Sequence, residues 1–515
     1  MQLRWLFLLA AAAASPAETT HLFWNWGKVD PGDTKFPLDR TQIGKDSLGV
    51  LEKVGRYYRI ELADGLTPPH RFNTASGVRI AVEKARKIGP WLKPDQPWEV
   101  MGINQGTVLH DSGKFRLWYA CSYERGRVIQ VAEDRYKLEY GQAMCYAESD
   151  DGMTWRKPAL GLVEFRGSTQ NNIVSKDPRI EGGTVFIDPT ARPEERYKLI
   201  SPTSLRAFEP KLQTNAGVLA GAVSGDGIHW KPLPEPLWKG HISDTYSGIT
   251  YDEKLARYVG FFRTSHGRRR SIGRSETADF AHWPIPSTIL TPAADEMPSD
   301  DFYSNGYSVH PGVPDGHLIL CSIYHRDISA LDVRLATSLD GVTWNWTSRE
   351  TIIERGAAGA WDGGSLYVSP QMVRLPDGRV AVPLAGYSHL HNEFWRIYYQ
   401  EGYPNTQGFG WAVWQDGRLA GIEARQKGEF TTLPLTAAGG EIRVNARTNT
   451  AGSIRVELIV EEGGAAKIFR AKEITGDRQW TPLDWEDPVD LRSLAGKPVR
   501  LRFLLYDAKV FGVRL

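Results

Sequence analysis

The sequence predicts an all-β protein: a five-bladed β-propeller followed by a β-sandwich domain. The first observation is that five segments begin alike, about sixty residues apart, and each continues into an apolar strand, a polar turn and a second apolar strand. The second is that a turn of the type Ser-x-Asp-Gly-x-x-Trp follows in four of the five. The third is that residues 425–515 alternate apolar and polar side chains over short runs separated by glycine turns, which indicates an antiparallel sandwich.

Each of the five segments opens the first strand of a predicted blade. In a propeller these first strands lie innermost, so residues at their starts converge at one end of the central channel. Four of the five openings carry an acid, and four carboxylates would therefore face one funnel. The openings begin at Asn104-Gln105, Glu181, Asp244, Asp301 and Asp362.

The aspartate turns are expected to be structural. Their Asp side chain caps backbone donors, the Gly takes a positive φ, and the Trp closes the turn against the blade. Three turns fit the pattern fully and one loosely: Ser149 to Trp155, Ser224 to Trp230, Ser338 to Trp344, and the looser Ser275 to Trp283. The fifth blade keeps only Trp414 to Arg418, as a terminal or ring-closing repeat often does.

The sequence predicts that the chain divides into four segments. Residues 1–17 resemble a secretory signal peptide, with Arg4, an apolar run and small residues before a cut after Ala17, so we expect a secreted or periplasmic protein. Residues 18–96 are expected to form an N-terminal extension packed on the propeller. The propeller then covers 97–424 and the sandwich 425–515.

The composition argues against two classes of partner. The 62 basic and 61 acidic residues nearly cancel, so neither nucleic acid nor a membrane surface is expected to bind, and no stretch is long enough for a membrane span. Eighteen tryptophans in an aromatic-rich chain suit a carbohydrate partner by ring stacking. We expect a monomer.

The three cysteines leave at least one unpaired. Cys121 and Cys145 belong to neighbouring strands of the first predicted blade, where either a cross-strand disulfide or two buried thiols would fit. Cys321 is expected in the core.

The turns are similar to the Asp boxes of sialidases, and the overall plan resembles glycoside hydrolase families 32 and 43. The junction Trp411-Ala412-Val413-Trp414 and the tail Leu494 to Phe503 carry the same resemblance. It implies a hydrolase acting on a poly- or oligosaccharide. Those families open the first blade with an essential carboxylate, whereas this chain has Gly102-Ile103-Asn104-Gln105-Gly106 there.

Glycosidic cleavage needs one protonated and one ionised carboxyl group. Asp244 is expected to stay ionised as base or nucleophile, because Arg263 on the next strand would lower its pKa. Glu181 is the expected general acid. Asp301 and Asp362 would orient hydroxyl groups, position water or bind a structural Ca²⁺; no other cofactor is expected.

The remaining candidates would bind substrate. Tyr246, Tyr303 and Trp361 lie beside the openings, where their rings would stack on a sugar. The polar candidates are Asn104, Gln105, Arg263, Arg326 and His389. Two alternatives stay open: a non-catalytic, lectin-like propeller, and a sialidase-like exo-glycosidase with Arg263, Arg326 and Arg396 around a carboxylate and Tyr398 or Tyr399 as nucleophile.

Overall fold

The structure is a computed structural model that describes residues 18–31, 75–126, 129–132, 135–137, 139–212, 216–238, 243, 245–393, 406–462 and 465–515. The chain divides into two compact units. One is the propeller, Val82–Leu419; the other combines the N-terminal part of the chain, up to Ala81, with Ala420–Leu515. The expected signal peptide, residues 1–17, lies outside the described residues.

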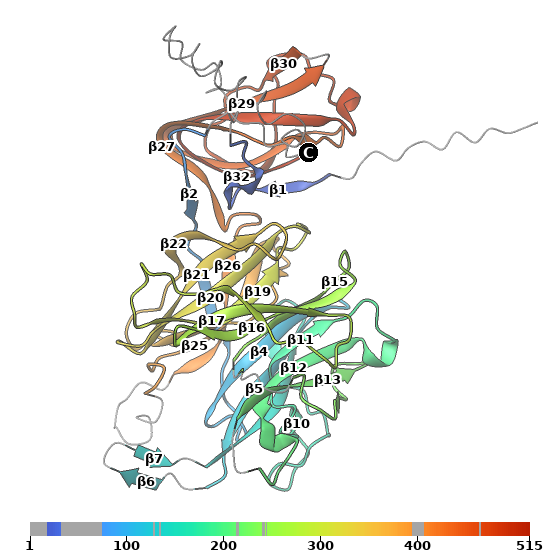
Figure 1. Cartoon of the computed structure of the whole chain (residues 1–515), viewed down its shortest axis with the longest axis vertical. Helices are drawn as coiled ribbons and strands as arrows, with labels where there is room; N and C mark the ends of the chain where they lie inside the picture. Colours follow the sequence, from blue (N-terminus) through green and yellow to red (C-terminus); the bar gives the residue numbers. More distant parts are fainter. Residues whose placement is uncertain are drawn as a thin grey trace, which may run out of the picture. The chain divides into compact units, whose positions relative to one another are not determined.

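The propeller has the five blades that the repeats predict (Figure 1). Each blade is an antiparallel sheet, and the first strand of its repeat lies at one edge. Blade 1 contains β4 (Gly102–Asp111), β5 (Lys114–Glu124), β8 (Tyr140–Ser149), β9 (Trp155–Arg156) and β10 (Ile173–Ser175). Blade 2 contains β11 (Thr184–Ile187), β12 (Tyr197–Ser204), β13 (Gly217–Ser224) and β14 (Lys231–Pro232).

Blades 3 to 5 repeat this plan. Blade 3 contains β15 (Gly248–Asp252), β16 (Arg257–His266), β17 (Arg269–Thr277) and β18 (Ser287–Leu290). Blade 4 contains β19 (Asp300–Val309), β20 (His317–His325), β21 (Ala330–Ser338) and β22 (Asn345–Ile353). Blade 5 contains β23 (Ser365–Val368), β24 (Val373–Arg374), β25 (Val380–Tyr387), β26 (Gln407–Trp414) and β3 (Arg86–Leu92).

The last of these strands closes the ring. β3 precedes blade 1 in sequence, yet it pairs antiparallel with β26 at the outer edge of blade 5. These residues were expected in an N-terminal extension. No local sequence pattern reveals the pairing, because the partner strand lies at the far end of the propeller sequence. The first and last parts of the propeller sequence are thereby joined in one sheet.

The aspartate turns have the predicted geometry. In the first, the Asp151 carboxylate accepts hydrogen bonds from the backbone of Met153 and Thr154, both at 2.7 Å. Gly152 has φ = 75°, and the Trp155 indole donates to its carbonyl at 3.1 Å. Asp226 and Asp340 bind their own turns in the same way.

The hydrophobic core of the propeller lies between blades. Phe261 of blade 3 packs on Tyr307 of blade 4, with ring centroids 4.2 Å apart, and Trp118 of blade 1 packs on Tyr197 of blade 2 at 5.8 Å. These side chains are almost completely buried. Apolar packing between neighbouring sheets therefore fixes the ring, since burying such rings is strongly favourable.

The other unit is a single eight-stranded antiparallel sheet with a buried apolar core. Its strands are β1 (Thr20–Leu22), β2 (Arg79–Val82), β27 (Ala420–Thr431), β28 (Leu435–Thr436), β29 (Arg443–Glu462), β30 (Ala465–Arg470), β31 (Asp477–Pro482) and β32 (Pro498–Arg514). The long strands contain register shifts, which bend a sheet over its own core. This architecture is compatible with the expected sandwich.

The N-terminal residues of this unit differ from the expectation. β1 pairs with the C-terminal strand β32, and Phe23 is buried against Phe430 and Phe503. Residues 20–23 therefore complete the C-terminal sheet, whereas they were expected to pack on the propeller. Their mostly buried side chains fit an edge of that sheet, and the pairing partner is far away in sequence.

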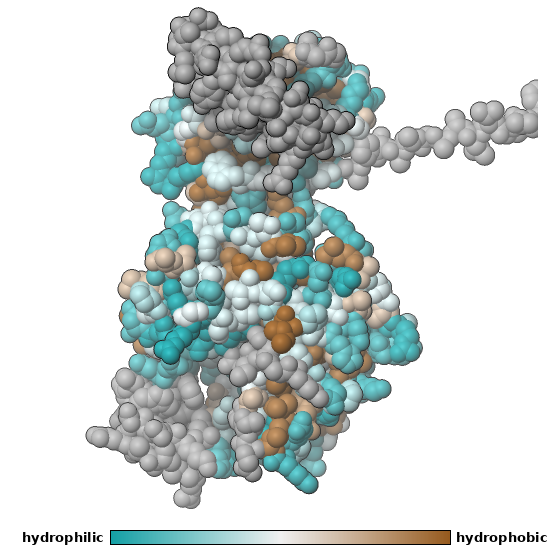
Figure 2. All heavy atoms as spheres, viewed as in Figure 1, coloured by the Kyte–Doolittle hydropathy of each residue, from teal (hydrophilic) through white to brown (hydrophobic). Residues whose placement is uncertain are grey.

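Short 3-10 helices complete the described chain: η1 (Trp26–Lys28), η3 (Pro193–Glu195), η4 (Leu205–Ala207) and η6 (Leu491–Leu494). Within the described residues, no helix has the length and apolar character needed to cross a bilayer. Figure 2 shows mainly hydrophilic side chains on the visible surface of each unit, with scattered hydrophobic patches. A hairpin of β6 (Ile129–Ala132) and β7 (Arg135–Lys137) is inserted between β5 and β8 of blade 1.

Cys121 and Cys145 form a disulfide between β5 and β8. Of the two arrangements left open by the sequence, the cross-strand bridge is therefore the one observed. Cys321 is buried in blade 4 as a free thiol, and burial raises its pKa.

Candidate functional site

A cavity of about 430 Å³ lies at the end of the propeller where the first strands begin. It is a polar and aromatic pocket, of the size typical for small-molecule sites. Its lining residues are Met101, Gly102, Asn104, Gln105, Ser122, Tyr140, Gln142, Thr245, Tyr246, Tyr303, Tyr367, Tyr387, His389, His391, Asn392 and Gln407. The predicted convergence of strand starts at one mouth is thus present.

Asn104 and Gln105 reach the cavity through a β-bulge in β4. The register with β5 shifts between Asn104 and Thr107, and Gln105 has φ = 45°. Gly106 occupies a site where a Cβ atom would lie 2.7 Å from the ring of Phe409. A bulge re-aims side chains in this way, and here it places two amides on the cavity wall.

Tyr246 and Tyr387 lie buried in the cavity and are held by backbone hydrogen bonds. The Tyr246 hydroxyl accepts from the Gly106 N–H at 2.8 Å, and the Tyr387 hydroxyl donates to the Ile103 carbonyl at 2.8 Å. Burial raises the pKa of both phenols, so both stay neutral. They present fixed rings to a ligand.

A second group of rings surrounds His391. Its ring centroid lies 4.7 Å from those of Tyr303 and Tyr324, and its Nδ1 shares a hydrogen bond with the Tyr367 hydroxyl. Burial, followed by the positive charges of Arg270 and Arg263, lowers the pKa of His391 to about 4. The imidazole is therefore neutral at physiological pH.

His389 is also a neutral imidazole. Burial lowers its pKa, and its Nδ1 lies 3.1 Å from the Leu390 carbonyl. It lines the cavity, as do Asn104, Gln105, Tyr246 and Tyr303 among the predicted substrate-binding residues. Their location agrees with the prediction, and their binding roles remain predictions.

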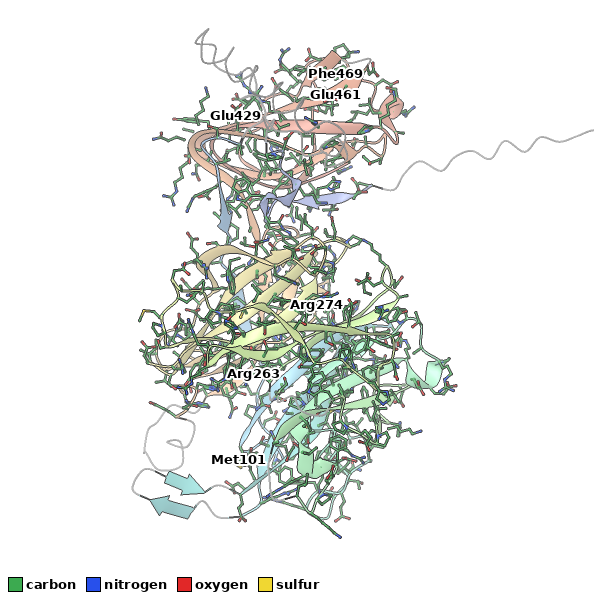
Figure 3. All side chains as sticks on the ribbon, in the orientation of Figure 1. Met101, Arg263, Arg274, Glu429, Glu461 and Phe469 are labelled. Carbon is green, nitrogen blue, oxygen red and sulfur yellow. A yellow bond between two sulfur atoms is a disulfide. The ribbon has the colours of Figure 1, made fainter. Side chains whose placement is uncertain are left out.

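Arg263 lies behind the wall and does not line the cavity. Its guanidinium group lies 4.4 Å from the centroid of the Tyr303 ring, and its Nη2 donates to the Tyr303 carbonyl at 2.7 Å. Figure 3 labels Arg263 beside the propeller strands, together with Met101 of the wall. Arg263 therefore orients Tyr303 from behind, a role that the sequence did not predict.

Asp301 is turned away from the cavity. The register of β19 shifts between Phe302 and Ser304, so Tyr303 points into the cavity while Asp301 faces blade 3. The Asp301 carboxylate pairs with Arg270 at 2.7 Å and accepts its backbone N–H at 3.0 Å. Arg326 lies 3.6 Å from the same carboxylate and binds the carbonyls of Pro298 and Ser299.

Trp361 and Asp362 are placed by blade 5. A Cβ atom on Gly386 would lie 2.4 Å from the Trp361 ring, so this indole covers the sheet of blade 5. The buried Asp362 carboxylate pairs with Lys87 of β3, the outermost strand. Neither residue lines the cavity, and the basic partner of Asp362 on the ring-closing strand was not predicted from the sequence.

Glu181 lies next to the wall, just before β11. Its N–H lies 3.3 Å from the Ser201 hydroxyl, and two residues later the Gly183 N–H donates to the carbonyl of the lining residue Gln105 at 3.1 Å. Burial raises the pKa of Glu181 to about 7, against a weaker opposing effect of Arg125. The carboxyl therefore stays mostly protonated below about pH 7.

The predicted meeting of four carboxylates is not what the described residues show. Among the described lining residues none is an acid, and Asp301 and Asp362 are bound in ion pairs on different blades. Within the part of the chain that the structure describes, no group of three or more His, Cys, Asp or Glu could hold a metal ion. The expectations for Asp244, Arg396, Tyr398 and Tyr399 fall outside the described residues.

Sequence reasoning missed Tyr140, Gln142, Tyr367, His391 and Gln407 on the wall. The antiparallel order of strands within a blade would have indicated these residues. In a four-stranded blade, the starts of the third strands and the ends of the second strands lie at the same end as the starts of the first strands. Considering the first strands alone therefore left out most of the rings and amides.

No family model matches the chain, and no curated protein matches it. Solved structures similar to it include a glycosyl hydrolase from Bacteroides ovatus, at 11% identity over 66% of this chain and 95% of that protein, with a TM-score of 0.42. An α-L-arabinofuranosidase from Podospora anserina has 13% identity over 65% and 98%, with a TM-score of 0.41. A sucrose-6-phosphate hydrolase from Lactobacillus gasseri has 9% over 82% and 93%, with 0.40. At these values the likeness assigns no activity.

Proposed function

We propose that this protein is a glycoside hydrolase that binds a sugar in the cavity at the first-strand end of the propeller. The lining offers amides, phenols and neutral imidazoles, which match the donors and acceptors of sugar hydroxyl groups. Tyr303, Tyr367 and Tyr387 add ring faces for the apolar C–H faces of a sugar. A pocket with apolar rings and a few convergent polar groups is the usual form of such a site.

Hydrolysis is proposed from the place of Glu181, two residues before Gly183, whose N–H donates to the lining residue Gln105, together with the raised pKa of its carboxyl group. A general acid must hold a proton at working pH and release it to the leaving oxygen. A carboxyl whose pKa is raised to about 7 meets that requirement. We assign Glu181 as the proton donor.

Asp244 is the proposed ionised partner, acting as base or nucleophile. The two residues that follow it, Thr245 and Tyr246, both line the cavity. The sequence order therefore supports a carboxylate close to the bound sugar. Whether it retains or inverts the anomeric centre depends on its separation from Glu181.

A second candidate function is carbohydrate binding without hydrolysis. It is favoured by the ion pairs of Asp301 and Asp362, which remove two of the four predicted acids from the pocket. Under this alternative the rings and amides bind a glycan and Glu181 only packs beside them.

Export is part of the proposal. The Cys121–Cys145 disulfide is typical of oxidising compartments, and the N-terminal segment resembles a signal peptide. Glycans of plant or microbial origin outside the cell would then be the substrates.

Two variants test the choice in the full-length protein: Glu181→Gln and Asp244→Asn. The assay measures sugar release from a panel of oligosaccharides and, separately, binding of the same sugars by titration calorimetry. A hydrolase loses roughly 10²–10⁴-fold in turnover and keeps its binding. A wild type that binds a sugar and never releases product supports the second candidate. No binding and no release from any sugar refutes both.

A further inference from the structure

Tyr140 is an exposed aromatic ring on the rim of the cavity. Its side chain is 50% exposed, whereas Tyr246 and Tyr387 deeper in the same pocket are 3% and 8% exposed. Among the described lining residues the other exposed side chain is Asn392, whose amide donates to the Tyr324 hydroxyl at 2.6 Å. The rim therefore offers a ring to solvent above a polar, ring-lined interior.

The strand fixes the backbone of Tyr140. Tyr140 begins β8 and pairs with Glu124 of β5, and the Arg125 N–H donates to the Glu139 carbonyl at 3.0 Å. On the opposite face of the strand, a Cβ atom at Gly141 would lie 2.4 Å from the ring of Tyr123. That face is filled by the Tyr123 ring, and Tyr140 lies on the cavity side of the strand.

Strand alternation then directs Tyr140 and Gln142 to the same face, which is the cavity face. Met101 lines the wall as well and is labelled in Figure 3. The β6–β7 hairpin departs from blade 1 just before Tyr140, so the blade is extended at this end (Figure 1). A partly exposed ring, an amide and a thioether thus form the outer part of one continuous pocket.

We propose that Tyr140, with Gln142 and Met101, forms an outer subsite that stacks on a second sugar unit when the first unit occupies the inner cavity. This inference rests on the proposed function and narrows its substrate class to an oligosaccharide or the end of a glycan chain. An exposed ring costs little to desolvate and gains C–H contacts on one sugar face. A free monosaccharide fills the inner part and leaves Tyr140 uncovered.

The test compares matched sugars on the full-length protein. Calorimetry with Glu181→Gln, which is expected to slow turnover strongly, measures Kd for xylose and xylotriose, glucose and cellotriose, and mannose and mannotriose. In the series that binds, the trisaccharide is expected to bind about tenfold tighter than the monosaccharide. Tyr140→Ala and Tyr140→Leu reduce trisaccharide affinity about 5- to 10-fold and leave monosaccharide affinity unchanged.

Two control variants separate stacking from general effects. Tyr140→Phe keeps the ring and is expected to hold both affinities within about twofold. Tyr506→Ala removes an equally exposed tyrosine, 52% exposed, from the other unit and should change neither. Thermal melting of each variant establishes that it is folded.

Three outcomes decide the matter. Equal binding of mono- and trisaccharide by the parent, or equal loss of both in Tyr140→Ala, overturns the outer subsite and leaves the proposed function standing. Loss of the trisaccharide preference alone supports it. If no sugar in the panel binds, the proposed function and the outer subsite both fail.

Discussion

The propeller contains two sets of repeated acidic residues, and they differ in the partners that they bind. Asp151, Asp226 and Asp340 each bind the backbone of their own turn in one geometry. The acids at the strand starts differ: Asp301 pairs with Arg270 of the neighbouring blade, whereas Asp362 pairs with Lys87 of the ring-closing strand. A repeat thus fixes the backbone position of a residue. It also fixes the group that the residue binds only when that group lies nearby in the sequence.

The largest stability effect should come from the strand-start set. Asp301→Ala leaves the Arg270 guanidinium without the carboxylate that binds it, although Arg270 keeps partial contact with water. Removing one member of a buried pair costs about 3–5 kcal/mol of unfolding free energy, and the partial exposure of Arg270 places the expected loss at or below about 3 kcal/mol. Urea unfolding measures it. A loss below about 0.5 kcal/mol would show that Asp301 contributes as little as a surface acid and would remove the contrast.

The pH dependence of stability distinguishes Glu181 from the other acids at the strand starts. Its folded-state pKa of about 7 lies above the ordinary 4.5, so the folded protein binds a proton that the unfolded chain has released. Stability should therefore fall as pH rises from about 4.5 to about 7, by up to roughly 3 kcal/mol. Glu181→Gln should flatten this fall in unfolding curves recorded at several pH values. An identical pH dependence in the variant contradicts the assignment.

The same carboxyl predicts the shape of the activity profile. If Glu181 donates the proton, turnover declines as pH rises through about 7, because the ionised form has no proton to give. Initial rates on a hydrolysed oligosaccharide between about pH 5 and 9 measure this. A basic limb that persists unchanged in the residual activity of Glu181→Gln would assign the proton to another group.

The smallest effects belong to the turns. Asp151→Ala, Asp226→Ala and Asp340→Ala each remove two backbone hydrogen bonds of an exposed turn, for about 1 kcal/mol each. The three losses should agree closely, as measured by denaturation.

The pKa values of Asp151 and Asp340 are lowered to about 2, chiefly by these backbone hydrogen bonds, which outweigh burial in Asp340. Their stabilisation is therefore present above about pH 4 and is lost between about pH 4 and pH 2.

The sequence was sufficient for features that depend on neighbouring residues. Blade number, strand order within each repeat and the turns at Gly152, Gly227 and Gly341 follow from spacing and local chemistry, and the structure shows them. Five of the predicted ligand-binding residues also lie on the cavity wall, because strand starts converge in a closed ring.

The missed features have two causes: irregular strand pairing and contacts distant in sequence. Two bulges, at Gln105 and beside Tyr303, decide which side chains enter the cavity, and no local pattern marks them. Lys87 reaches Asp362 only after β3 has joined blade 5. Trp361 was also expected on the wall and instead covers the sheet of blade 5.

The joining of β3 to β26 has a consequence for how the molecule is made. β3 leaves the ribosome before any blade, and its hydrogen-bonding partner is synthesised only after four blades have followed. An early strand with an unsatisfied edge is prone to pair with the wrong chain. The ring can therefore close only after the last blade has been translated. Chains interrupted before Gln407 should be captured by chaperones or form aggregates.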